Sequence, residues 1–172
     1  MDLLDFLKSK RSVKQYQHKS IDHDLIEKIV EAGLYAPSGR NSQDVKMLVV
    51  ENEEVVRKIA QLNASVMGVN MDPFYGAPVV IVVFADKNCH THIEDGSLVM
   101  ANLMLEAHAL GVDSCWIHRA KETFLTVEGR MIAQNYGIPD NYEGIGNCIL
   151  GYYEGNYPIA SKRKENRVIY IK

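Results

Sequence analysis

Two short polar stretches carry residue types that together can bind a phosphate and a flat heterocycle. The first, residues 11–14, places Arg11 and Lys14 three positions apart with the hydroxyl of Ser12 between them. A guanidinium fork beside an ammonium group suits a phosphate monoester. Because most basic runs of this kind form only a solvated surface, the interpretation of this stretch depends on the second one.

The second stretch, residues 36–43, reads Ala-Pro-Ser-Gly-Arg-Asn-Ser-Gln and separates an expected helix from an expected strand. Pro37 cannot continue a helix and the glycine two positions later tolerates unusual backbone angles, so the chain must turn and leave backbone N–H groups unpaired. Ser38, Asn41 and Gln43 add side-chain donors and acceptors, and the two amides can bind the edge of a heterocycle. In isolation the loop would be an ordinary helix cap and turn.

Three further features suggest chemistry, but we expect a structural role for each. The run from Cys89 to Asp95 contains two histidines that an extended segment would place on one side; it lacks a recognisable zinc spacing, so we expect a solvated loop and no metal. Cys115 is expected to be a small buried residue in a strand rather than a nucleophile. His108 is expected to be a satisfied core or interface histidine rather than a general base.

Composition narrows the class of protein. The 172 residues, 47% of them hydrophobic, predict a single domain over residues 1–172 with a substantial core. A net charge of -3 and a pI near 6.1 give no electrostatic signature of nucleic-acid binding. The start lacks the basic region of a signal peptide, no apolar run approaches the roughly 20 residues that span a bilayer, and three widely spaced cysteines disfavour a disulfide framework. We therefore expect a cytoplasmic protein with no nucleic-acid or membrane partner.

The spacing of apolar residues predicts the elements that position these stretches. Helices are expected at residues 3–7, 22–34, 55–66, 95–110 and 123–136, and strands at residues 45–50, 79–84, 114–117, 146–151 and 167–171. Asp22 is expected to cap the second helix, and Gly111 and Gly137 to end the last two. Because helices and strands follow one another without regular alternation, we expect an α+β sandwich rather than a doubly wound sheet.

In order and spacing, these features resemble the FMN-dependent nitroreductase family over nearly the whole chain. The matching segments are residues 11–14, 36–43, 76–78 (Gly-Ala-Pro before an apolar strand), 102–111, 114–116 and 162–164. The resemblance implies an α/β/α sandwich with a central mixed, mainly antiparallel sheet. It also implies a homodimer with an exchanged terminal segment and two FMN molecules at the subunit interface.

The resemblance further implies roles for individual residues. Arg11, Ser12 and Lys14 would contact the FMN phosphate and the edge of the flavin ring, and Arg163, together with Lys162, would contact the phosphate. Lys14 stands where many family members carry arginine, which keeps the charge but loses the bidentate fork.

Other positions would surround the ring itself. Pro37 and Ser38 would come from the opposite subunit, Asn41 and Gln43 would hold polar groups of the flavin, and Asn70 would lie near its pyrimidine end. The backbone of three consecutive strand residues would run beside the ring: Ser114, Cys115 and Trp116.

The implied activity is a two-electron ping-pong reaction in which NADH or NADPH reduces the flavin and an acceptor such as a nitroaromatic or a quinone then reoxidises it. Since the flavin supplies this chemistry, no side chain is assigned as catalytic, and Lys14 is given only an electrostatic role near the N1–C2 edge. Two alternatives are a flavin-binding sensor or store with little turnover, and an FMN-free protein that keeps only the fold.

Overall fold

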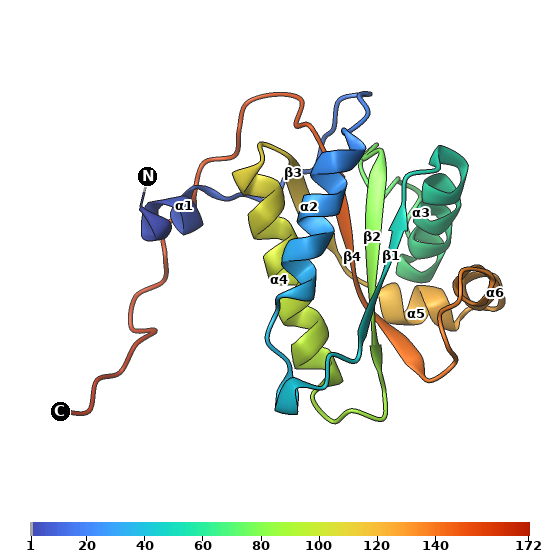
Figure 1. Cartoon of the computed structure of the whole chain (residues 1–172). Coiled ribbons are helices and arrows are strands. Elements are labelled where there is room, and N and C mark those ends of the chain that lie inside the picture. The colour runs from blue at the N-terminus through green and yellow to red at the C-terminus, as the bar shows by residue number, and fades with distance from the viewer. Residues whose placement is uncertain (1) are drawn as a thin grey trace.

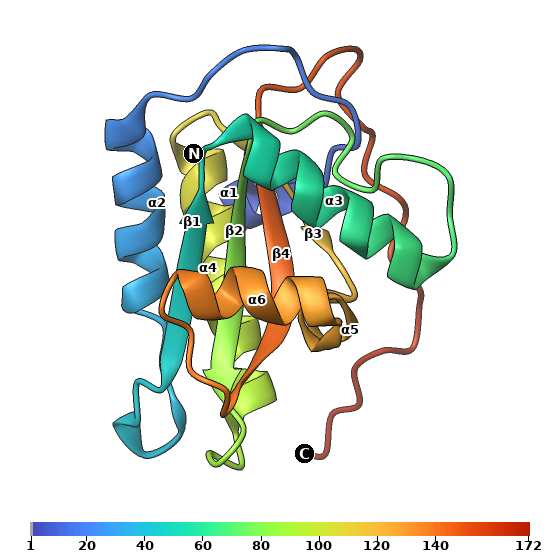
Figure 2. The same ribbon diagram turned by 90° about the vertical axis from the view of Figure 1, so that its right-hand side faces the viewer.

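The computed structural model describes residues 2–172, and its centre is a four-stranded sheet in the order β1-β2-β4-β3. The strands are β1 (Val45–Val50), β2 (Val79–Asp86), β3 (Asp113–Ile117) and β4 (Tyr142–Gly151). Helices α2 (His23–Leu34) and α4 (His92–Ala109) cover one face, and α3 (Glu53–Met67), α5 (Ala120–Leu125) and α6 (Val127–Asn135) cover the other (Figures 1 and 2). The expected α/β/α sandwich is confirmed.

Strand β2 explains why helices cover both faces. Its residues from Val79 to Ala85 are all buried, and successive side chains point to opposite sides of a strand. Val79 and Ile81 pack into the cluster under α2 and α4, whereas Val80 and Phe84 pack into the cluster under α3, α5 and α6. A strand with two apolar faces is stable only when both are covered.

The sheet is antiparallel throughout its three strand pairs. The parallel component is a single bridge between Ser12 and Ser114, which places the N-terminal segment along the outer edge of β3. A β-bulge lies between Val83 and Phe84, where β2 pairs with β4. The strand expected at residues 146–151 is the second part of β4, which begins at Tyr142.

The helix boundaries follow the capping residues. Asp22 and Asn52 accept hydrogen bonds from backbone N–H groups in the first turns of α2 and α3. Gly111 and Gly137, both with positive φ, follow the ends of α4 and α6. Among the helices described within residues 2–172, none combines the length and the apolar character needed to cross a bilayer.

The prediction of one continuous helix over residues 123–136 is wrong. The chain breaks at Thr126, whose extended ψ of 156° ends α5 and whose hydroxyl accepts a hydrogen bond from the N–H of Gly129 at 3.0 Å to begin α6. A Cβ on Gly129 would lie 2.1 Å from the carbonyl oxygen of Thr123, so the glycine permits this close turn.

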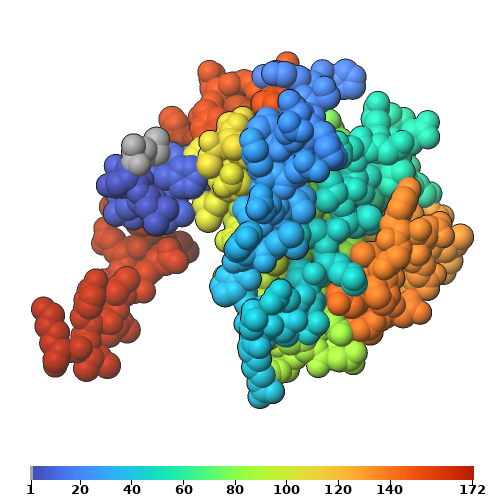
Figure 3. Space-filling model, viewed as in Figure 1, coloured from blue at the N-terminus to red at the C-terminus, as the bar shows by residue number. Residues whose placement is uncertain are grey.

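The two terminal segments lie outside the layers. Helix α1 (Leu3–Ser9) and the tail that follows β4 project from the body (Figure 3). The strand expected at residues 167–171 is not formed in the single chain: the segment has no regular secondary structure, and Ile169 and Ile171 are 88% and 99% exposed. Within residues 2–172 it makes no strand pairing.

Candidate functional site

The first sequence-predicted stretch runs along the edge of β3. Besides the bridge between Ser12 and Ser114, the N–H of Val13 donates to the carbonyl oxygen of Ser114 at 3.3 Å. Val13 is fully buried and anchors the segment, so the neighbouring side chains of Ser12 and Lys14 remain exposed. The fold thus brings the basic segment together with the predicted strand residues Ser114, Cys115 and Trp116.

Some polar atoms where residues 11–14 meet the edge of β3 can still form hydrogen bonds to a ligand. Within residues 2–172, Nε of Arg11 and Oγ of Ser114 are buried without a hydrogen-bond partner, whereas Nη1 of Arg11 donates to the carbonyl oxygens of Lys8 and Lys10. Buried polar atoms nearly always find a partner. The orphaned donor and hydroxyl, on segments paired beside the exposed Lys14, fit an anionic, hydrogen-bonding group.

Lys10 lies beside the same part of the β3 edge, and it was not among the residues predicted from the sequence. Its ammonium group lies 3.4 Å from Oγ of Ser12 and 3.6 Å from Sδ of Met104. Burial lowers the pKa of Lys10. Its position two residues before Ser12 in a basic run was the available signal.

Lys14 has an aromatic neighbour that the sequence did not indicate. Its ammonium nitrogen lies 5.8 Å from the centroid of the Tyr75 ring, a distance at which a cation and an aromatic ring attract each other. Tyr75 has a positive φ of 54°, which is unusual for a bulky residue. Both carboxylate oxygens of Asp72 hold the turn by accepting from the N–H groups of Phe74 and Gly76 at 2.8 Å.

The second predicted stretch lies at the opposite end of α4 (Figure 1). The N–H of Gly39 donates to Asp95 in the first turn of α4 at 2.9 Å, whereas Ser9, just before the basic segment, hydrogen-bonds His108 in the last turn at 2.7 Å. At 1.5 Å per residue, Asp95 and His108 are about 20 Å apart along the helix. One chain therefore does not bring its own residues 37–43 to its own residues 11–14.

The loop itself holds its polar residues in a defined arrangement. Oγ of Ser38 accepts from the N–H of Gln43, and Nε2 of Gln43 donates to Oδ1 of Asn41, both at 3.1 Å. Pro37, Asn41 and Gln43 are exposed.

The remaining predicted residues stand apart from both groups. Asn70 is exposed and lines a groove between α3 and the loop of residues 69–78. Lys162 and Arg163 lie on the exposed tail, where Lys162 pairs with Glu165 at 3.1 Å. Nearer its start, the tail packs against the body through Tyr157. Burial and nearby Asp113 raise the pKa of Tyr157.

The expected structural roles of the reactive residues agree with the structure. Cys115 is 3% exposed and burial raises its pKa, which keeps the thiol protonated and disfavours nucleophilic chemistry. His108 is satisfied by Ser9, and burial lowers its pKa. The suggested alternation of histidines 90 and 92 is wrong, because the second one begins α4. Residues 2–172 contain no group of three or more His, Cys, Asp or Glu side chains that could hold a metal ion.

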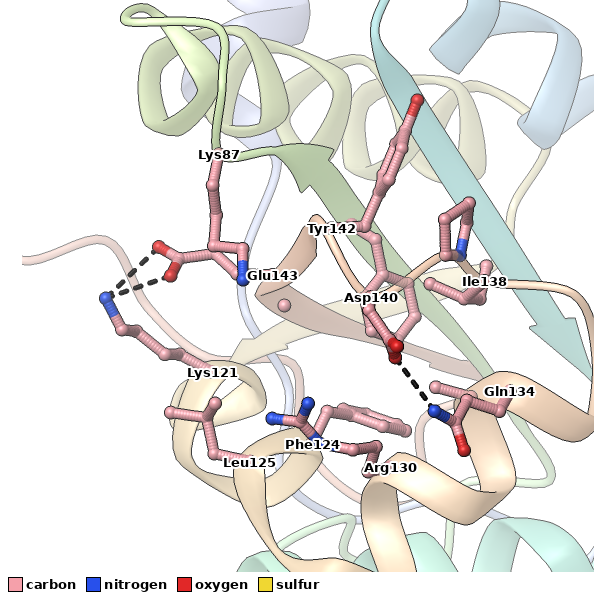
Figure 4. A pocket seen from close by; sticks show the side chains of 14 residues that line it. Lys87, Lys121, Phe124, Leu125, Arg130, Gln134, Ile138, Asp140, Tyr142 and Glu143 are labelled. Carbon is pink, nitrogen blue, oxygen red and sulfur yellow. Dashed lines mark hydrogen bonds and ion pairs between the residues drawn. The ribbon is translucent and has the colours of Figure 1, made fainter.

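A separate shallow pocket lies between α5, α6 and the start of β4 (Figure 4). Glu143 forms an ion pair with Lys121 at 3.0 Å and hydrogen-bonds His92 at 3.3 Å. Burial raises the pKa of Glu143, but these two hydrogen bonds outweigh it and lower the pKa overall. No residue of either polar stretch lines this pocket, so we do not assign it to the candidate site.

Comparisons with known proteins agree on one family. The model described as "Nitroreductase family" matches residues 7–70 and 66–152. A protein of Methanothermobacter thermautotrophicus named "Putative NADH dehydrogenase/NAD(P)H nitroreductase" is 29% identical over 163 residues, which cover 88% of this chain and 78% of the relative.

Solved structures show the same fold. A nitroreductase with bound FMN from Bacteroides fragilis is 25% identical, covers 100% of both chains and superimposes with a TM-score of 0.92. A second FMN-bound nitroreductase, from Desulfitobacterium hafniense, is 21% identical, covers 98% of this chain and 97% of its own, and gives a TM-score of 0.87.

Proposed function

Since the chain belongs to the nitroreductase family, we propose that it is an FMN-dependent oxidoreductase that uses NAD(P)H to reduce small-molecule acceptors such as nitroaromatics or quinones. The observation that carries the proposal is the bridge between Ser12 and Ser114. It aligns a basic segment with the edge of β3 and leaves buried polar atoms there without partners among the described residues.

The phosphate is assigned to cations from both ends of the chain. Arg11, Ser12 and Lys14 line the β3 edge, and Lys162 and Arg163 would be brought to it by an exchanged tail. A phosphate monoester carries a charge of about -1.5 to -2, which this set of cations neutralises. Charge-assisted hydrogen bonds of this kind are among the stronger ones in proteins.

The ring is assigned to the strand and to the loop of a second copy. The backbone of Ser114, Cys115 and Trp116 would run beside it, and Asn70 would lie near the pyrimidine end. Polar contacts would come from the loop residues Pro37, Ser38, Asn41 and Gln43. Because this loop and the basic segment lie about 20 Å apart along α4, a site that uses both needs two chains.

The surface supports a homodimer with an exchanged tail. Large apolar side chains are exposed on the terminal segments and on α2, including Leu3 at 72%, Leu34 at 66%, Val168 at 65% and Ile169 at 88%. Exposed apolar side chains on segments that project from the body offer a surface that a second copy can cover. The three cysteines are unpaired, which supports the cytoplasm as the compartment.

Bound FMN would supply the redox chemistry, by accepting a hydride from NAD(P)H and then passing two electrons to the acceptor in a ping-pong sequence. The chain's own residues bind and orient it. Lys14, held near Tyr75, would bring a positive charge to the pyrimidine edge. No side chain is assigned as an acid or a base, and the protonated thiol of Cys115 takes no covalent part.

The test is an absorption spectrum of the protein reconstituted with FMN, recorded anaerobically before and after addition of NADH and then NADPH. Flavin bands that bleach, and that return when a nitroaromatic or a quinone is added, support the oxidoreductase and identify the better donor. Bands that do not bleach favour a flavin store or sensor. If no FMN is retained after gel filtration, the assignment of the β3 edge as a phosphate site is wrong.

A further inference from the structure

Asp95 is a buried carboxyl group at the start of α4, and its hydrogen-bond partners among residues 2–172 are all neutral. It is 4% exposed. Oδ1 accepts from the N–H of Gly39 at 2.9 Å, and Oδ2 accepts from the hydroxyl of Thr91 at 2.9 Å and lies 3.8 Å from Sγ of Cys89. Burying a carboxyl group is costly unless its hydrogen bonds are made, so both oxygens have defined positions.

The loop that Asp95 contacts is conformationally demanding. Arg40, Asn41 and Gln43 all have positive φ, between 54° and 55°. Non-glycine residues adopt this region at an energetic cost and keep it only when the surroundings fix them. Three such residues within four positions require an external anchor.

The contact between the loop and α4 is also sterically tight. A Cβ on Gly39 would lie 2.3 Å from Oγ1 of Thr91, so the backbone of the loop rests directly on the residue that precedes α4. The hydrogen bond from Gly39 to Asp95 crosses this contact and joins segments that are 56 positions apart in the sequence. The wider second link, between Ser42 and Cys89, measures 3.8 Å.

We propose that Asp95 is the positioning residue that fixes the loop of residues 37–43, so that it fits against the flavin bound by the partner subunit. The inference rests on the proposed function, because that function assigns Pro37, Ser38, Asn41 and Gln43 to the flavin. Within residues 2–172, the carboxyl group of Asp95 hydrogen-bonds Gly39, Thr91 and Cys89, and it acts through the loop. Its carboxyl group holds the strained backbone in the binding conformation before the cofactor arrives.

The experiment uses the full-length protein and two readouts. Hydrogen–deuterium exchange of the peptide covering residues 36–43 reports on the anchor without requiring flavin, and fluorescence titration gives the Kd for FMN. In Asp95→Ala we expect exchange in this peptide to accelerate at least tenfold and the Kd to rise at least tenfold. Asp95→Asn keeps an acceptor for Gly39, so both values should stay within about threefold of the wild type.

Two further variants separate positioning from general destabilisation. Gly39→Ala displaces the same contact without altering Asp95 and should reproduce both effects; it also keeps the proposal testable if Asp95→Ala does not fold. The double variant of Asp95→Ala and Gly39→Ala should exchange and bind FMN much like either single variant, because both substitutions remove the same contact. Asn63→Ala removes another buried polar group, the α3 amide that donates to His118 and Thr123, and should leave the exchange of residues 36–43 unchanged.

The outcomes are distinguishable. Wild-type exchange at residues 36–43 in Asp95→Ala, or a loosened loop with an unchanged Kd, would overturn the positioning role. An Asp95→Asn variant as defective as Asp95→Ala would also contradict it, because the hydrogen bond to Gly39 would then not be what matters. If the wild-type protein binds no FMN, the proposed function fails, whereas the anchoring of the loop is still decided by the exchange rates.

Discussion

Replacing Ile169 with serine separates the stability of one chain from that of the proposed dimer. Ile169 is 88% exposed in the single chain, so the substitution should leave the thermal unfolding of the body unchanged. Burying an isoleucine contributes about 2 kcal/mol, and in a twofold dimer each substitution occurs twice, which gives about 4 kcal/mol. At 1.4 kcal/mol per tenfold, the dimer dissociation constant should rise roughly a thousandfold.

The measurement is sedimentation velocity over a dilution series, with FMN retention recorded on the same samples. Val127→Ser is the matched control, because Val127 is also largely exposed, at 78%, but starts α6 on the other face of the sheet. The control should dimerise like the wild type. If Ile169→Ser also dimerises like the wild type, or if Val127→Ser loses as much affinity, the exchanged tail does not contribute the proposed contact.

Three further results are expected. Lys14→Ala should raise the Kd for FMN by about tenfold or more, the loss of one charge-assisted contact, or should slow flavin reduction by NAD(P)H in stopped flow; unchanged values for both would contradict its assignment. In the native protein at pH 8, one thiol, that of Cys89, should react quickly with Ellman's reagent. Burial raises the pKa of Cys115 and raises that of Cys148 to about 12, so these two thiols stay protonated. Fast reaction of all three thiols would contradict the burial of Cys115 and Cys148. Glu143→Gln should lower the thermal stability near pH 7. The difference in stability between variant and wild type should vanish as the pH falls below the ordinary carboxyl range and through the lowered pKa of Glu143. A difference that persists at low pH would mean that the ion pair is not its cause.

The sequence predicted the layers well because they depend on local periodicity. The continuous apolar run of β2 and the cap at Asp22 are properties of a few neighbouring residues. The helix break at Thr126 escaped prediction because a threonine that caps one helix is not distinguishable, by spacing alone, from a threonine inside a longer one. The close approach of Gly129 to a neighbouring carbonyl decided it.

The tail shows a different limit. Residues 167–171 have the composition of a strand, but composition does not tell which chain supplies the partner strand. In one chain the segment forms no strand and stays exposed, so its pairing in the proposed dimer stays a prediction.

For the candidate site, the two polar stretches were found from residue types, and their assignment to flavin stays a prediction. The residues that hold them were not found. Asp95 is 56 positions from Gly39, and Tyr75 reaches Lys14 from a loop beyond α3. Contacts at such separations follow from the folded sheet, and a single sequence carries no local signal for them.

The strand buried on both faces also matters before the protein is folded. Residues 79–85 form an uncharged, β-branched and aromatic run, which is the composition of segments that aggregate when exposed. Pro78 precedes this run and Asp86 ends it, as residues that interrupt pairing between copies. During synthesis β1 is already available as a neighbour, but β4 begins only at Tyr142, so one edge of β2 stays open while the intervening chain is made. The yield of folded protein should therefore depend on how long the edge of β2 stays unpaired before β4 is made, rather than on the stability of the finished sheet.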